Sequence, residues 1–127
     1  MSTRMATESK ETRALCKRMR DVGAVTLSIV GSVEQGAGWP DRYLSHPLLG
    51  PGGIWMEFKS CTGRVKRIQR ERLEHLRRTG ARACVGRFVP EGLRLETPDG
   101  SMIVDLDLDQ PIRLIMKGIY DSTCRKA

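Results

Sequence analysis

Two carboxylates and an amine stand close together near the middle of the chain. Asp41 follows a proline, and Glu57 and Lys59 lie one residue apart in residues 54–59, a run of bulky apolar residues typical of a strand. Because side chains alternate faces along a strand, Glu57 and Lys59 share one face, about 6–7 Å apart. A hairpin-like return through residues 45–53 would bring Asp41 beside Glu57.

This set of residue types suits metal-assisted hydrolysis of a phosphodiester. Mg²⁺ takes oxygen ligands, often one or two carboxylates with waters and substrate phosphate oxygens. Asp41 and Glu57 are the candidate metal ligands, together with the backbone carbonyl of Phe58. Lys59 would orient the attacking water or stabilise the negative charge that develops on the phosphate. The alternative is a surface Glu-x-Lys on an edge strand and an aspartate that merely follows a proline.

A helix is expected over residues 65–79, closed by Gly80. Gln69 falls near the middle of its apolar stripe, and a buried amide must find hydrogen-bond partners. We expect Gln69 to bond a metal-binding carboxylate or a metal-bound water; a structural amide bonding only backbone is the alternative. The stripe consists of Val65, Ile68, Leu73 and Leu76.

An earlier helix is expected from Thr7, a candidate N-cap, to Gly23. Its expected apolar stripe is Leu15, Met19 and Val22. Glu8 and Glu11 extend this stripe, seven and four residues before Leu15. An acid in line with a buried face is unusual, although an N-terminal acid can also serve only the helix dipole.

Together these residues resemble the VRR-NUC family, the virus-type replication-repair branch of the PD-(D/E)XK nucleases. The resemblance runs from about residue 8 to residue 88. It implies an α/β fold with an αβββαβ core, Mg²⁺ or Mn²⁺ dependence, and cleavage of DNA. Stand-alone relatives come largely from phages and bacteria and resemble structure-selective nucleases that act on branched DNA as homodimers. The matching residues are Gly38, Pro40, Asp41, Glu57, Phe58, Lys59, Gly63, Arg64, Gln69, Leu73, Leu76 and Gly80.

The resemblance also implies that a glutamate of the first helix reaches the metal site. The spacing to Gly23 favours Glu8 over Glu11 for this role. The sequence departs from the family at residues 65–68, which lack a Ser/Thr-Pro-like helix start. That departure predicts a weaker helix cap and leaves the catalytic set unchanged.

The charge balance fits a polyanionic partner, with 22 Lys and Arg against 15 Asp and Glu. Residues 64–78 hold seven Lys or Arg and two acids, a net of +5. Arg64, Lys66, Arg70 and Arg77 are the candidate DNA-binding residues of this stretch, and a solvated helix face is the alternative for each. The four scattered cysteines and the lack of a membrane-length apolar run favour a cytoplasmic protein.

The remaining strands are expected at residues 25–30 and 82–89, followed by a hairpin of residues 93–96 and 102–106. We expect one domain over residues 1–127, with a core at about 7–89 and a C-terminal extension at about 90–127. That extension is the expected dimer contact, since the core needs no further strand.

The sequence therefore predicts a Mg²⁺- or Mn²⁺-dependent DNA endonuclease acting on branched DNA, such as four-way junctions or flaps. A non-catalytic nucleic-acid-binding module with the same fold is the rival. It is disfavoured because Asp41, Glu57, Lys59 and Gln69 are all present. Action on RNA stays open, because no recognisable module reads a 2′-hydroxyl.

Overall fold

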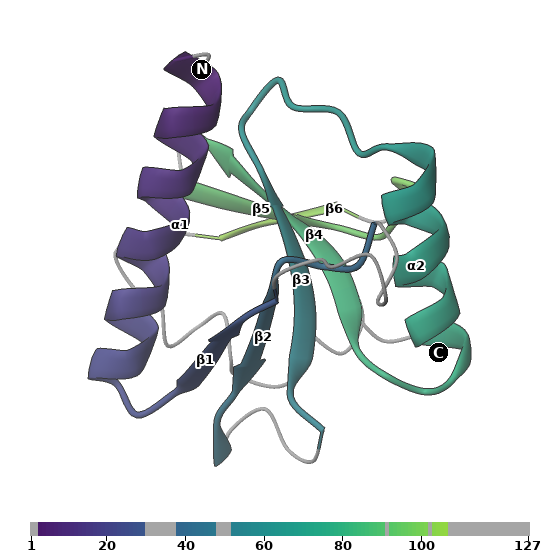
Figure 1. Ribbon diagram of the computed structural model, residues 1–127, viewed down its shortest axis with the longest axis horizontal. Coiled ribbons are helices and arrows are strands. Elements are labelled where there is room, and N and C mark those ends of the chain that lie inside the picture. Colours follow the sequence, from purple (N-terminus) through teal and green to yellow (C-terminus); the bar gives the residue numbers. More distant parts are fainter. Residues whose placement is uncertain (1–2, 30–37, 48–51, 91, 102, 107–127) are drawn as a thin grey trace.

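A six-stranded mixed sheet lies between two helices in the computed structural model (Figure 1). The structure describes residues 3–29, 38–47, 52–90, 92–101 and 103–106, with side chains from residue 10 to residue 101 of these ranges. The elements are α1 (Thr3–Asp21), β1 (Val25–Ser28), β2 (Arg42–Ser45), β3 (Ile54–Lys59), α2 (Arg67–Arg78), β4 (Ala83–Val89), β5 (Gly92–Glu96) and β6 (Ile103–Leu106).

The strands follow one another across the sheet in sequence order, β1 to β6. Neighbours run antiparallel except β3 and β4, which are parallel. Parallel neighbours need a crossover connection, and α2 supplies it. The expected αβββαβ core with a C-terminal hairpin is therefore confirmed, and β3 with its carboxylate lies in the interior of the sheet.

Helix α1 packs on one face of the sheet and forms the larger hydrophobic core. Its buried residues Leu15 and Met19 belong to one cluster with Ile54, Met56 and Phe58 of β3. The Phe58 ring stacks on Phe88 at 5.6 Å between centroids. This face of β3 is the one that period-two alternation predicts to be apolar, so Glu57 and Lys59 must project from the other face.

Two expectations about α1 are wrong. The helix begins at Thr3 rather than near Thr7, because residues 3–7 contain neither Gly nor Pro to stop it. Val22 lies beyond the helix end and keeps 40 % of its surface exposed, so it does not continue the buried stripe. The exposed Val22 carbonyl lies 2.9 Å from Nε2 of His46, in the connection after β2.

Strand β1 also differs from expectation. It spans only Val25–Ser28 rather than residues 25–30, and Val25 and Leu27 are 57 % and 50 % exposed. Leu27 pairs with Tyr43 of β2, which in turn pairs with Trp55 of β3. All three therefore share the α2 side of the sheet. Helix α2 packs over β3 and β4, with Leu73 against Ala83 and Val85, and leaves the β1 edge uncovered.

The expected fourth strand and the hairpin β5–β6 are both present. Leu93 and Leu95 of β5 are fully buried in the same cluster as α1. The turn between the strands is closed by the Gly100 N–H donating to the Thr97 carbonyl, with Gly100 at φ +76°. Strand β5 therefore contributes to the core, and the dimer contact expected of the C-terminal extension stays a prediction.

Two parts of the sequence-based expectations lie outside the described residues: residue 30 of the first expected strand, and residues 107–127 of the expected C-terminal extension. Neither described helix is long and apolar enough to cross a membrane.

Candidate active site

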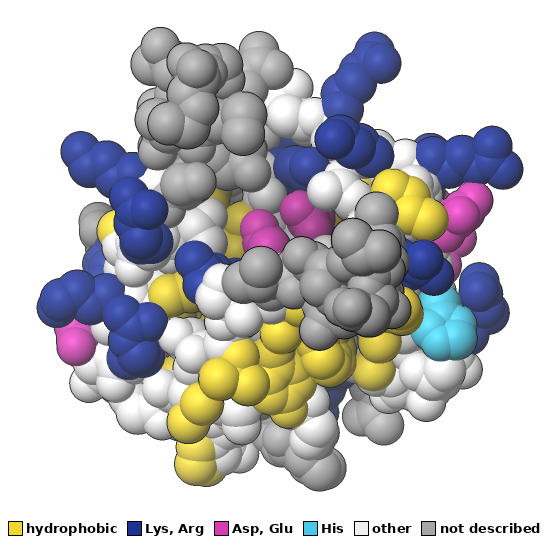
Figure 2. Space-filling model, in the orientation of Figure 1, with side chains coloured by type: hydrophobic (Ala, Val, Ile, Leu, Met, Phe, Trp, Pro, Cys, Tyr) yellow, Lys and Arg dark blue, Asp and Glu magenta, His cyan; other side chains and the backbone are white. Residues whose placement is uncertain are grey.

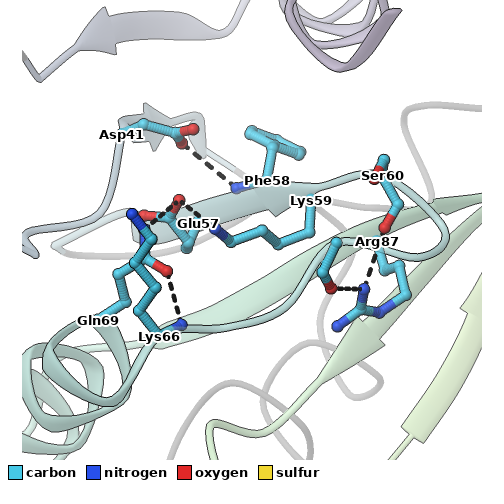
Figure 3. Close-up of polar contacts among 9 residues, drawn as sticks. Asp41, Glu57, Phe58, Lys59, Ser60, Lys66, Gln69 and Arg87 are labelled. Atoms are coloured by element: carbon cyan, nitrogen blue, oxygen red, sulfur yellow. Dashed lines mark hydrogen bonds and ion pairs between the residues drawn. The ribbon is translucent and has the colours of Figure 1, made fainter. Parts of the chain in front are cut away.

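Strand pairing brings the two predicted metal carboxylates to the same place. The antiparallel register of β2 and β3 pairs Arg42 with Met56, so the next residues along, Asp41 and Glu57, lie across from each other. The Phe58 N–H donates to Asp41 Oδ1 at 3.3 Å (Figure 3). Asp41 is thus fixed against the strand that carries Glu57, as the hairpin-like return predicted.

Glu57 and Lys59 form a buried ion pair on the α2 face of β3. Their side chains are only 7 % and 11 % exposed, and Lys59 Nζ lies 3.8 Å from Glu57 Oε2. Burying a charge is costly unless it is paired and hydrogen-bonded. A buried pair at a strand end is therefore unlike the surface Glu-x-Lys that was the alternative interpretation.

Gln69 connects helix α2 to this pair. Its Nε2 donates to Glu57 Oε2 at 3.3 Å, while its Oε1 accepts from the Lys66 N–H at 2.9 Å. The second bond is the glutamine half of a capping box. The lysine half cannot form, because an ammonium group has no lone pair with which to accept. The missing Ser/Thr-Pro start is thus partly offset by Gln69, which has the expected carboxylate partner.

Arg87, which was not predicted from the sequence as a site residue, holds the loop between β3 and α2 by hydrogen bonds. Arg87 of β4 bonds Glu96 of β5 through Nε at 2.8 Å, and both side chains are about 85 % buried. Its Nη1 donates to the carbonyls of Ser60, at 3.0 Å, and Gly63. An arginine within an apolar strand, with an acid in the next hairpin strand, was the available signal.

The residues just before Asp41 lie against α2. Gly38 has φ +87°, and a Cβ there would come within 2.6 Å of Ile68 Cγ1. Trp39 lies beneath Arg72, whose Cζ is 4.7 Å from the ring centroid, and meets the His75 ring edge-on at 6.2 Å. Glycine at 38 is therefore required by its backbone conformation and by its close packing on the helix.

The predicted DNA-binding residues do not all face solvent. Arg64, Lys66 and Arg70 are exposed, but Arg77 is half-buried and its Nη1 donates to the Ala83 carbonyl at 3.2 Å. The placement of Arg77 on an open outward face is wrong, because the guanidinium folds back to the start of β4. Figure 2 shows acidic side chains near the middle of one face, with Lys and Arg around its rim.

Of the two candidate acids in helix α1, the structure describes the side chain of Glu11 but not that of Glu8. Glu11 is half-buried and lies one turn before Leu15, in line with the buried stripe. Glu8 lies one turn earlier within α1, and its side chain is not among the described ones. The choice of Glu8 stays a prediction.

Comparison with known proteins supports the fold at a coarse level. No family profile matches the chain, and no curated protein matches it. Among solved structures, the chain is similar to Archaeoglobus fulgidus Hjc, a Holliday junction resolvase from an archaeal hyperthermophile. The TM-score is 0.55 at 17 % identity, over 90 % of this chain and 98 % of that chain. The chain has the restriction-endonuclease-like fold. Membership of the VRR-NUC branch stays a prediction.

Within that fold, the donor set fits a hard divalent cation. Asp41 and Glu57 supply carboxylate oxygens from adjoining strands, and Mg²⁺ is commonly held by only one or two carboxylates with waters. In the described ranges, no set of three or more His, Cys, Asp or Glu side chains is grouped to hold a metal ion. Asp41, Glu57 and the Phe58 carbonyl stay the predicted protein ligands, and such a set leaves positions for water and phosphate oxygens.

Proposed function

We propose that the protein is a Mg²⁺- or Mn²⁺-dependent DNA endonuclease, selective for branched DNA. The observation that carries this proposal is the arrangement around Glu57. Asp41 lies across from it in register, and Lys59 Nζ and Gln69 Nε2 both approach its Oε2. A buried carboxylate held beside a buried ammonium, with a second carboxylate across from it, is a candidate functional site.

Each residue of the proposed site has a separate role in phosphodiester hydrolysis. A cation bound by Asp41 and Glu57 would lower the pKa of a bound water and offset charge on the phosphate. Lys59 is held by its ion pair with Glu57, so its remaining N–H bonds can orient the water for attack on phosphorus. The same ammonium can stabilise charge on the phosphoryl oxygens. Gln69 fixes the Glu57 carboxylate from the helix side.

The proposed DNA surface is the start of helix α2 and the turn before it. Arg64, Lys66 and Arg70 are exposed there, close in sequence to Gln69. Contacts with phosphates fix the position of the duplex without reading its sequence. Such a surface suits an enzyme that recognises the shape of DNA.

We also propose that the protein acts as a homodimer, because two symmetric cuts at a branch need two sites and two-fold dimers are the commonest oligomers. The exposed apolar side chains of Val25 and Leu27 on edge strand β1 support self-association. We further propose that this DNA-acting enzyme works in the cytoplasm.

The direct test compares labelled duplex, flap, splayed and four-way DNA as substrates, each with Mg²⁺ and with excess chelator. The proposal expects chelator-sensitive cleavage of branched DNA and little cleavage of duplex. The four-way junction is the first substrate to try, because the structurally similar Hjc is a Holliday junction resolvase. Binding without cleavage under every metal condition would favour the non-catalytic module instead.

A further inference from the structure

Helix α2 contacts both sides of the candidate metal site. It packs against residues 38–39, just before Asp41, and it carries Gln69, which bonds Glu57. Ile68 and Arg72 of α2, one turn apart, contact Gly38 and Trp39. Gln69, on the same turn, donates to Glu57. Because an α-helix is a rigid unit over so short a span, these contacts tie both carboxylates to a common support.

Trp39 provides an aromatic contact on the Asp41 side of this support. Its ring lies under the Arg72 guanidinium at 4.7 Å and against the His75 edge at 6.2 Å and 76°. A guanidinium within about 6 Å of an indole face is attracted by the ring, more strongly where water is excluded. Trp39 is half-buried, and only the buried Pro40 separates it from Asp41.

We infer that Trp39 is a positioning residue of the metal site, clamped by Arg72 and His75 so that Asp41 stays at the spacing from Glu57 that a divalent cation requires. This inference rests on the proposed function and deepens it. Trp39 touches neither cation nor phosphate; it acts through the backbone it shares with Asp41. Residues that orient metal ligands typically change metal affinity or activity by about 10–100-fold when they are replaced.

The test measures Mn²⁺ binding without DNA, by the electron paramagnetic resonance signal of free Mn²⁺ during titration of the full chain. Trp39→Ala is expected to raise the Mn²⁺ dissociation constant by about 10-fold or more. Trp39→Phe keeps an aromatic ring and should stay within about 3-fold of the parent. Arg72→Met should raise the Mn²⁺ dissociation constant by several-fold, because Trp39 loses its cation–π contact with the guanidinium.

Arg78→Met is the matched control. Arg78 is an exposed α2 arginine outside the Trp39 cluster, so its removal should leave the Mn²⁺ dissociation constant unchanged. The affinity of Trp39→Ala for four-way DNA, measured without a divalent cation, should also equal that of the parent. Circular dichroism melting establishes that each variant is folded. If Trp39→Ala does not fold, the comparison of Arg72→Met with Arg78→Met decides the question.

The outcomes separate this inference from the proposed function. If the parent binds no Mn²⁺, or Asp41→Ala binds it as the parent does, the proposed metal site itself is wrong. If Asp41→Ala loses Mn²⁺ while folded Trp39→Ala binds it normally, only the positioning role is overturned. Loss of DNA affinity with normal Mn²⁺ binding would overturn it too, and would make Trp39 a DNA contact.

Discussion

Gln69 donates a hydrogen bond from Nε2 to Glu57 Oε2 over 3.3 Å, while its own carbonyl oxygen accepts the Lys66 N–H at 2.9 Å. One side chain therefore caps a helix and orients a carboxylate. Oε1 caps the helix and Nε2 orients the carboxylate, so substitutions can separate the two effects.

Gln69→Ala should remove both bonds. We expect turnover to fall by about 10–100-fold, as for other residues that orient metal ligands. Loss of the cap should lower the free energy of unfolding by about 1 kcal/mol. Gln69→Glu can still accept from Lys66 but repels Glu57, so it should lose turnover and keep the helix start. Single-turnover cleavage and urea denaturation measure the two effects, and equal activity of Gln69→Glu and the parent would refute the orienting role.

Lys66 and Arg70 should set the salt dependence of DNA binding. Reversing both charges, with Lys66→Glu and Arg70→Glu, should weaken binding to all sequences alike. Each lost phosphate contact should lower the log–log salt slope by about 0.9 for duplex DNA. Turnover at saturating DNA should change little. Fluorescence anisotropy titrations at several salt concentrations give the slope, and an unchanged slope would mean that DNA enters elsewhere.

Arg77 should behave differently from Lys66 and Arg70, because its guanidinium bonds the Ala83 carbonyl. Arg77→Met should leave the salt slope unchanged. It should lower the free energy of unfolding by about 1–2 kcal/mol, toward the low end for a hydrogen bond to a charged group, because Arg77 is partly exposed to water. A fall of the slope as large as that of Arg70→Glu would show that Arg77 turns outward to contact phosphate.

The pair of Arg87 and Glu96 should be important for stability. Arg87→Met leaves a largely buried carboxylate without its partner, which should cost on the order of 3 kcal/mol. The double variant Arg87→Met with Glu96→Met should be less destabilised than the sum of the two single variants. Urea denaturation of the four proteins closes this cycle. Additive losses would show that the two side chains act independently.

Self-association should depend on the exposed apolar residues of β1. Leu27→Lys is expected to shift the parent homodimer toward monomer in light scattering, because it places a charge in the apolar contact. Ser28→Lys is the control, since Ser28 is also exposed but lies on the opposite side of the strand. A parent that is monomeric at cleavage-competent concentrations would refute the dimer.

Local periodicity predicted the parts of the structure that depend on neighbouring residues. The alternation in residues 54–59 gave the correct faces for Glu57 and Phe58, and the apolar stripe of α2 placed Gln69 against the sheet. Local periodicity does not show which strand residues a helix covers. Val25 and Leu27 have a strand pattern, but no single-sequence rule states that α2 stops short of them.

The supporting contacts of the site were harder to foresee for a related reason. Arg87 reaches the carbonyls of Ser60 and Gly63 from more than twenty residues away, and Trp39 meets Arg72 across the crossover. Both contacts depend on strand order and helix placement. The direction of Arg77 is likewise set by the start of β4, which helical periodicity does not include.

We propose above all that Asp41 and Glu57 form one metal-dependent catalytic site. The most direct measurement is single-turnover cleavage of a labelled four-way junction with Mg²⁺ by the parent, Asp41→Ala and Glu57→Ala, with junction affinity measured in parallel. We predict that both variants lose cleavage and keep most of their DNA affinity, because affinity comes mainly from phosphate contacts. Cleavage by folded Glu57→Ala within about tenfold of the parent rate would contradict the account.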